Sequence, residues 1–184
     1  MDYVSACNIC LAVVGESPIT DLNSPNPSLG LVRNYLDEAR LLLLSRRWWF
    51  NDIEVTLQPA VDGVVHVPYR VLDLYSPDET LYSVRNQELF DIATQSKLIG
   101  KEVTLRLSLD MPLDLLPEVA AQWVAYTAAS SMYADDLGVD QNMQSIQARA
   151  NSAWSMLHTQ ELRQRRYSTS KTKRMARIRS ALVT

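Results

Sequence analysis

The sequence contains little cysteine, glycine or histidine: its 184 residues include two Cys, five Gly and two His. Two cysteines cannot staple a chain of this length, and Cys7 and Cys10 fall within an apolar helical pattern, where free cysteine packs as a small hydrophobe. We therefore expect no disulfide and no redox or metal CxxC. We also expect a protein that is made and kept in a reducing compartment, without a cleaved leader.

Long apolar runs are missing as well. No uncharged stretch approaches the about 20 residues that a membrane-spanning helix needs, so we expect a soluble protein without a membrane contact. An apolar content of 47% still suffices for one compact domain. A domain of this length buries about 70% of the surface that its unfolded chain exposes.

Motifs that carry chemistry are scarce too. His66 and His158 have no second ligand at metal spacing, and no Ser or Cys is paired with a base in a recognisable motif. Asp135 and Asp136 are adjacent, so on a helix they point in different directions and do not suit paired acid and base work. There is no Walker loop and no GxGxxG. We expect no cofactor, no metal and no enzyme activity, and interpret both histidines as structural.

Charge is distributed unevenly along the chain. Eight of the 18 basic residues follow position 162, and no acidic residue follows Glu161. Residues 1–162 therefore carry a net charge of −11 and the remainder +8, although the whole chain carries only −3. An acidic body with a basic tail follows from this distribution.

The stretch 29–50 is the strongest helical pattern. Steps of three and four place one apolar stripe on one face: Leu29, Val32, Leu36, Ala39 and Leu43. We expect Tyr35, Leu42 and Leu44 to widen this stripe, and the polar residues to face water or another subunit: Arg33, Asn34, Asp37, Glu38 and Arg40. Two cations and three aromatic rings follow at the exit of the helix, and we expect Trp48 and Phe50 to be largely buried there.

Three further helices are predicted. One covers residues 2–14 and ends at Gly15, a second follows Pro117 and stops at Gly138, and a third is capped by Asp140. The second of these is rich in alanine, which allows close helix approach and, in our interpretation, side-by-side packing of subunits.

Between residues 51 and 110 the apolar period changes from 3.6 to 2. The alternation predicts a β-hairpin from residues 53–57 and 64–67 with its tip at Asp62 and Gly63 and its end at Pro68. Further short strands are predicted at 71–75, 81–84, 88–91 and 102–109, with a turn at Asn86 and Gln87. We expect at least one open edge in this part, and deletion of residues 61–65 to impair assembly more than folding.

These patterns predict an α+β fold, an antiparallel bundle of about four helices with an inserted small β-subdomain. The helical bundle would comprise residues 1–50 and 111–166, the β-subdomain residues 51–110, and a basic C-terminal arm residues 167–184.

Four ordered motifs span about residues 4 to 160: VGESPITDLN, EARLLLLSRRWWFN, VTLQPAVDGVVHVP and then LDMPLDLLPEVAAQWVAYTAASSMY. In their order and separations they resemble the tail tubular protein A family, the head-to-tail adaptors of short-tailed, podovirus-type bacteriophages. The matching positions are Gly15, Glu16, Pro18, Arg46, Trp48, Phe50, Asn51, Leu57, Pro59, Asp62, Gly63, Pro68 and Pro117. Ser17 and Arg47 depart from the family, which usually has proline and often glycine there.

The resemblance implies a structural virion protein that assembles in the host cytoplasm. Its subunits would form a homo-oligomeric, dodecameric ring that joins the portal protein to the tail nozzle, tail tubular protein B, with tail fibres as a further partner. Double-stranded DNA would pass through the lumen during ejection, without sequence-specific binding.

Two other classes stay open at this point. A nucleic-acid-binding packaging or regulatory protein would act through the basic tail, although the body shows no helix-turn-helix, zinc or RNP signal. A tail-associated hydrolase is the weaker alternative, because no catalytic constellation is visible.

The arm has its own pattern. Met175, Ile178 and Leu182 recur at helical spacing among basic residues, which predicts a short amphipathic helix that needs a surface to lie on. The candidate docking residues are Arg165, Arg166, Lys171, Lys173, Arg174, Met175, Arg177, Ile178, Arg179 and Leu182. Docking onto the portal or the next subunit is the functional interpretation; a solvated tail is the alternative.

Overall fold

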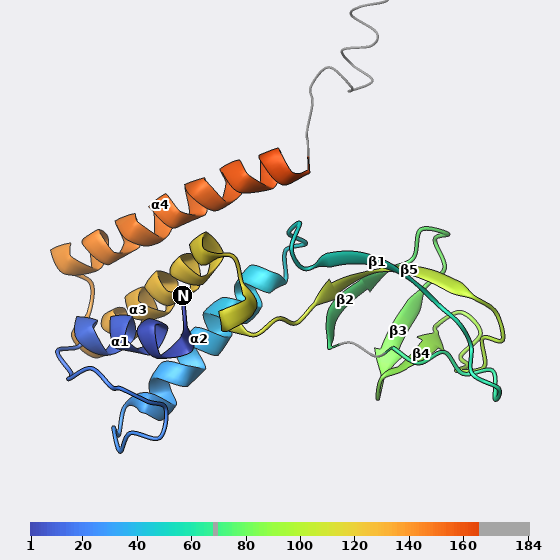
Figure 1. The fold of residues 1–184 in the computed structure, drawn as a ribbon, viewed down its shortest axis with the longest axis horizontal. Helices are drawn as coiled ribbons and strands as arrows, with labels where there is room; N and C mark the ends of the chain where they lie inside the picture. Colours follow the sequence, from blue (N-terminus) through green and yellow to red (C-terminus); the bar gives the residue numbers. More distant parts are fainter. Residues whose placement is uncertain (68–69, 166–184) are drawn as a thin grey trace, which may run out of the picture.

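The computed structural model describes residues 1–67 and 70–165 of the chain (Figure 1). Pro68 and the arm from Arg166 onward lie outside the described residues, so the predictions made for them stay predictions. In the described part, no helix is both long and apolar enough to cross a membrane.

The helical part contains α1 (Tyr3–Val13), α2 (Leu29–Leu44), α3 (Glu118–Leu137) and α4 (Gln141–Gln164). Helix α3 packs against each of the other three, with α4 along one side of it and α1 and α2 along the other (Figure 1). A 3₁₀ turn, Leu113–Leu115, leads into α3, and Pro117 lies at its N-cap. The predicted helices are confirmed, except that α2 ends at Leu44 and the aromatic exit is a series of turns.

The helix ends follow from local chemistry. Asp2 and Asp140 cap α1 and α4, their carboxylates accepting from the Ser5 amide at 2.7 Å and the Met143 amide at 2.9 Å. Gly15, at φ 77°, ends α1 in a Schellman motif, since its amide donates to Ala12 and the next amide donates to the Leu11 carbonyl at 3.0 Å.

Five alanines of α3 are buried within the subunit: Ala120, Ala121, Ala125, Ala128 and Ala129. They let α3 approach the other three helices closely, as predicted. Our interpretation of these alanines as a subunit-packing face is wrong, because they form the interior of this subunit's own bundle.

The β part holds a three-stranded antiparallel sheet in the order β1-β5-β2, formed by Asp52–Leu57, Val103–Leu109 and Val71–Tyr75. The β3–β4 hairpin (Tyr82–Arg85 and Glu88–Asp91) turns at Asn86 and Gln87, which adopt φ of 52° and 63°. Two successive residues at positive φ are typical of the turn that matches strand twist. The predicted turn and α+β class are therefore confirmed.

The predicted hairpin between residues 53–57 and 64–67 is wrong. Strand β1 pairs over its whole length with β5, from Asp52 opposite Ser108 to Leu57 opposite Val103. Residues 64–67 form only isolated bridges, of Val64 with Leu98 and His66 with Glu88 among others. Alternation identifies a strand but not its partner, and the pairing with β5 places Leu105 and Leu107 in the core of the β part, where both are completely buried.

Two side chains of α2 differ from expectation. Leu42 does not join the buried stripe but is 57% exposed, because it faces the gap between α2 and α4. Arg40, expected to face water, is largely buried and pairs with Asp110, and its guanidinium also donates to the Met111 carbonyl at 2.9 Å. Burial lowers the pKa of Arg40, but the hydrogen bond and ion pair with Asp110 raise it by more.

Candidate functional site at the helix–sheet junction

The turns after α2 bring three aromatic rings and one amide into the junction between the helical and β parts. Trp48 is 3% exposed, and its indole nitrogen donates to the Leu43 carbonyl at 2.8 Å. Its ring stacks on Phe50, with centroids 6.3 Å apart, and meets Trp154 of α4 edge-on at 5.3 Å. Trp48 thus joins the exit of α2 to α4, and its predicted burial is confirmed; Phe50 is half-buried.

Asn51 is the polar centre of this junction and is completely buried. Its side-chain oxygen accepts from the Trp48 amide at 2.9 Å. Its side-chain nitrogen donates to the Leu44 carbonyl at 2.9 Å and the Ser108 hydroxyl at 3.1 Å. Asn51 therefore satisfies the last carbonyl of α2 and links it to β5. These contacts need a side chain that both donates and accepts hydrogen bonds, which explains why an amide stands at this position.

Charged side chains surround these groups where α4 ends. Asp52, whose side chain is 4% exposed, pairs with Arg106 at 2.7 Å and Arg165 at 3.3 Å. Arg165 also pairs with Glu161 and donates to the Arg47 carbonyl. Arg165 is one of the predicted docking residues, but the structure places it in this ion-pair network of the body.

Two further ion-pair and hydrogen-bond contacts extend the network to other elements. Arg47 pairs with Asp73 of β2 at 2.6 Å, and the Trp49 amide donates to Glu161 of α4 at 3.1 Å. Arg46, by contrast, lies over the Trp154 ring at 4.7 Å. The junction therefore fixes β1, β2 and β5 to the ends of α2 and α4.

Glu16 acts in a second cluster, in the loop between α1 and α2. Its carboxylate accepts from the Asn26 side chain at 2.9 Å and from the Ser28 hydroxyl beside the start of α2. Asn8 exchanges two hydrogen bonds with the Ile19 backbone, at 2.9 and 2.8 Å. These contacts order a proline-containing loop in which Pro18 itself is exposed.

The turn at residues 59–63 lies at the far end of the β part. Asp62 accepts from the Val64 amide at 3.0 Å, and Gly63 adopts φ 82°. The Gly63 carbonyl accepts from the Ile99 and Gly100 amides at 3.0 Å each, so this turn is held against the 99–100 segment. Pro59 forms a bridge with Val65.

The remaining candidates serve packing. Cys7 and Cys10 are fully buried and free, and burial raises the pKa of Cys10 to about 12. His158 packs 4.7 Å from Trp154. Among residues 1–67 and 70–165, no group of three His, Cys, Asp or Glu could hold a metal ion.

Sequence patterns did not reveal the ion-pair network. Asp52 meets Arg106 only because β1 pairs with β5, and Arg165 meets Asp52 only because α4 runs back to the junction. The aromatic residues at 48–50 indicate the position of the junction in the sequence, but they do not identify the charged side chains that surround it.

Comparison with known proteins matches nearly the whole chain to one family. The family model described as Tube, tail tubular protein, matches residues 4–167. The chain is also similar to the tail tubular protein A of Klebsiella phage KP34, with 38% identity over 182 residues that cover 98% of each chain. The match thus includes the helical part, the β part and the junction between them.

Proposed function

This chain belongs to the tail tubular protein family and is a structural protein of a bacteriophage tail, and we propose that it builds the adaptor ring between the portal and the tail nozzle of a short-tailed phage. The observation that carries the proposal is the extent of the match, which covers both parts and the junction. An adaptor has to hold two binding surfaces at a fixed separation.

The junction supports this role physically. Asn51, Trp48 and the Asp52 ion pairs fix the β part to the helices through buried groups, and a buried amide that is hydrogen-bonded at both ends, as in Asn51, favours a single arrangement. In the proposed ring, residues 1–50 and 111–166 form the helical wall, and residues 51–110 contact a neighbour or the nozzle.

The β part offers surfaces for such contacts. Strands β1 and β2 are the two edges of its sheet, and the exposed apolar side chains of the β part include Val61, Leu81 and Leu98. Open strand edges and exposed apolar side chains are typical of protein contacts. We propose that a neighbouring subunit, tail tubular protein B or a tail fibre covers them.

The acidic body suits a DNA channel. Residues 1–162 carry −11, and a wall of this sign repels phosphates, so a duplex slides instead of binding. We propose a dodecameric ring with this lumen. Salt-dependent binding of duplex DNA to the free subunit would instead favour the nucleic-acid-binding alternative.

The direct test is co-expression with the phage's portal protein, followed by electron microscopy of the purified complex. We expect rings of this chain stacked on the portal, and twelvefold symmetry in class averages. Monomers that do not associate with portal or nozzle under any buffer condition would contradict the proposal.

A second test addresses the arm, which we propose docks on the portal. Truncation after Arg166 keeps Arg165 and its ion pairs, so we expect the bundle and the junction to stay folded. Portal attachment should weaken, and attachment of the full chain should fade with added salt because surface charges are screened. Equal attachment of both proteins at every salt concentration would contradict the arm's role.

A further inference from the structure

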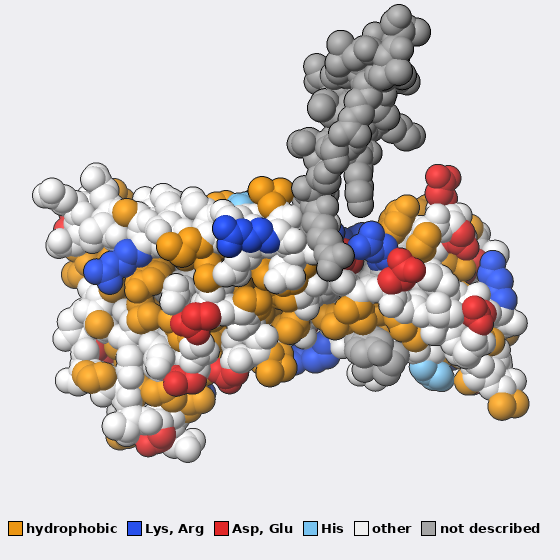
Figure 2. All heavy atoms as spheres, turned by 45° about the horizontal axis from the view of Figure 1, so that its top comes forward, with side chains coloured by type: hydrophobic (Ala, Val, Ile, Leu, Met, Phe, Trp, Pro, Cys, Tyr) orange, Lys and Arg blue, Asp and Glu red, His pale blue; other side chains and the backbone are white. Residues whose placement is uncertain are grey.

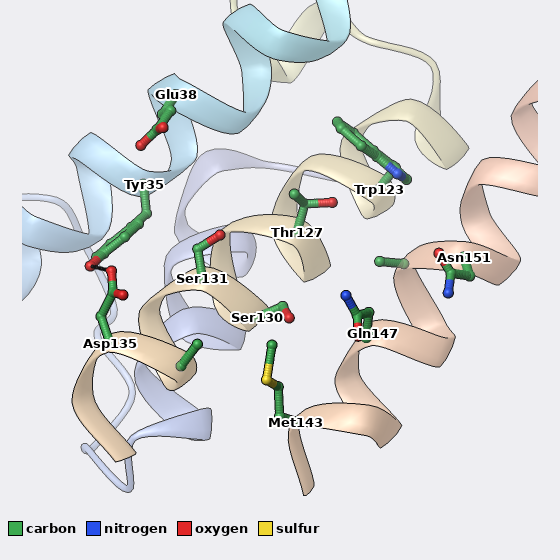
Figure 3. Close-up of a pocket in the computed structure, with 12 residues that line it drawn as sticks. Tyr35, Glu38, Trp123, Thr127, Ser130, Ser131, Asp135, Met143, Gln147 and Asn151 are labelled. Carbon is green, nitrogen blue, oxygen red and sulfur yellow. Dashed lines mark hydrogen bonds between the residues drawn. The ribbon is translucent and has the colours of Figure 1, made fainter. Parts of the chain in front are cut away.

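A groove runs over α3 between α2 and α4 (Figure 3). Its volume is about 530 Å³, with Tyr35 and Glu38 of α2 on one wall and Met143 and Gln147 of α4 on the other. Small side chains of α3, among them Ser131, form its floor. The floor is low because these side chains of α3 are short, so the side chains of the two outer helices rise above it.

The groove continues in both directions along the bundle. It shares Trp123 and Asn151 with a hollow of about 270 Å³ that is also lined by Leu42 and Trp154. At the other end it shares Tyr35 and Asp135 with a hollow of about 200 Å³ that Leu31 also lines. The three hollows lie next to one another along α2, and we call them together the α2–α4 groove.

The wall of α2 has the pattern of a helix-packing seam. Leu31, Tyr35, Glu38 and Leu42 recur at steps of four, three and four, which places them in one row. Leu31 and Leu42 are 50% and 57% exposed. This is a second stripe on α2, separate from the buried one, and the described elements leave its two leucines largely uncovered.

The charge of the groove is predominantly negative. Its lining includes four carboxylates, of Glu16, Glu38, Asp135 and Asp136, and one base, Arg46. Asp135 accepts from the Tyr35 hydroxyl at 2.5 Å, so its charge is held at the rim. On the face drawn in Figure 2, acidic and apolar side chains lie side by side on the helical part.

The sequence beyond the described residues is complementary to this surface. Residues 171–182 contain five Lys or Arg and no acid, with Met175, Ile178 and Leu182 at helical spacing. Apolar anchors at i, i+3 and i+7 are those that a helix uses when it binds in a groove. Opposite charges on the segment and the groove would also speed their association.

The length of the chain permits this contact within one subunit. From Arg165 to Asn151, α4 spans about 21 Å at 1.5 Å per residue. The nine residues 166–174 reach about 30 Å when extended, so they can return the chain to the groove.

We propose that residues 171–182 bind in the α2–α4 groove of their own subunit, as a helix that completes the bundle. The basic side chains face Glu38 and the Asp135 rim, and the three apolar side chains contact Leu42, Trp123 and Met143. This contact concerns the free subunit. It does not depend on whether the same segment reaches the portal in the assembled tail.

The test uses the full chain with a bimane label at Thr172→Cys, one turn before Met175. Cys7 and Cys10 are fully buried and burial raises their pKa to about 11 and about 12, so only the new cysteine reacts quickly at neutral pH. Tryptophan quenches bimane on contact, and Trp123 and Trp154 line the near end of the groove. We expect the label to be quenched, and Trp123→Phe to reduce the quenching.

Two arginine variants separate this groove from other surfaces. Ser131→Arg adds a bulky cation to the floor and should abolish the quenching, whereas Ser145→Arg adds the same side chain to a different hollow beside α1 and should leave it unchanged. Both positions are exposed, and circular dichroism checks that each variant is folded. Salt at 1 M should also abolish quenching, because the Debye length falls to about 3 Å.

Three outcomes would overturn the proposal. Absence of quenching in the full chain means that the segment does not bind the groove. Quenching that survives Ser131→Arg places the segment elsewhere. Quenching that disappears on dilution, or when unlabelled chain is added in excess, identifies the occupant as the arm of a second copy.

Discussion

The helical part of the described structure buries 24 side chains in its main cluster, whereas the β part buries eight. A core of eight side chains over five short strands is too small to supply much stability alone. The bundle cluster includes Trp48, which lies at the contact with the β part. The comparison indicates that the β part depends on the junction for its order, while the bundle has enough buried surface of its own.

The strongest test of this dependence is Trp48→Ala. Loss of the buried ring should lower the free energy of unfolding by about 3 to 5 kcal/mol, since a large cavity remains between α2 and α4. Urea unfolding measures it, and hydrogen exchange should show opening of the β part before the bundle. Trp49→Ala, at a partly exposed position, is the matched control and should cost less. An unchanged melting curve for Trp48→Ala would contradict the proposed dependence of the β part on the junction.

A smaller effect is expected for Asn51→Leu. The substitution keeps the size of the side chain but leaves the Leu44 carbonyl and the Trp48 amide without their partner, which costs about 1 to 3 kcal/mol. Asn34→Leu, at an exposed position of α2, is the control and should change stability by less than about 0.5 kcal/mol. Similar losses of unfolding free energy for the two variants in urea would show that the hydrogen bonds of Asn51 do not stabilise the junction.

Substitution of an exposed and of a buried valine can distinguish the proposed contact surface of the β part from its core. Deletion of residues 61–65 would remove Val64 and Val65, which are buried, so it cannot distinguish assembly from folding. Val61 is fully exposed at the turn, and Val61→Asp should leave stability within about 0.5 kcal/mol of the parent while reducing ring formation on the portal. Val65→Asp should instead unfold the β part. Normal rings from Val61→Asp would remove this turn from the proposed interface.

The smallest effect concerns pH and the bundle alone. The hydrogen bond from the Met143 amide holds the pKa of Asp140 below its usual value. The carboxylate therefore stabilises α4 above the unfolded pKa of about 3.9, and this contribution is lost as pH falls through the lower folded value. Asp140→Asn keeps a cap without this titration, so the difference in melting temperature from the parent should change between about pH 6 and pH 2.

The sequence predicted the helices well because their signals are local. The caps at Gly15, Gly138 and Asp140 and the three-four spacing each depend on residues within one or two turns. The pairing of β1 with β5 was missed because it joins residues about 50 positions apart, and alternation contains no information about partners. The same distance concealed Asp52 and Arg106 as a pair. The burial of Arg40 was missed for a similar reason, since Asp110 follows the last strand.

The order of the elements along the chain has a consequence for synthesis on the ribosome. Helices α1 and α2 are made first, but their partner α3 begins about 70 residues after α2 ends, a delay of about 4 to 15 s at typical translation rates. Strand β5 emerges just before α3, so β1 also meets its partner only after about 50 further residues have been made. The nascent chain thus exposes the apolar faces of α1 and α2 for seconds, during which a chaperone has time to bind them.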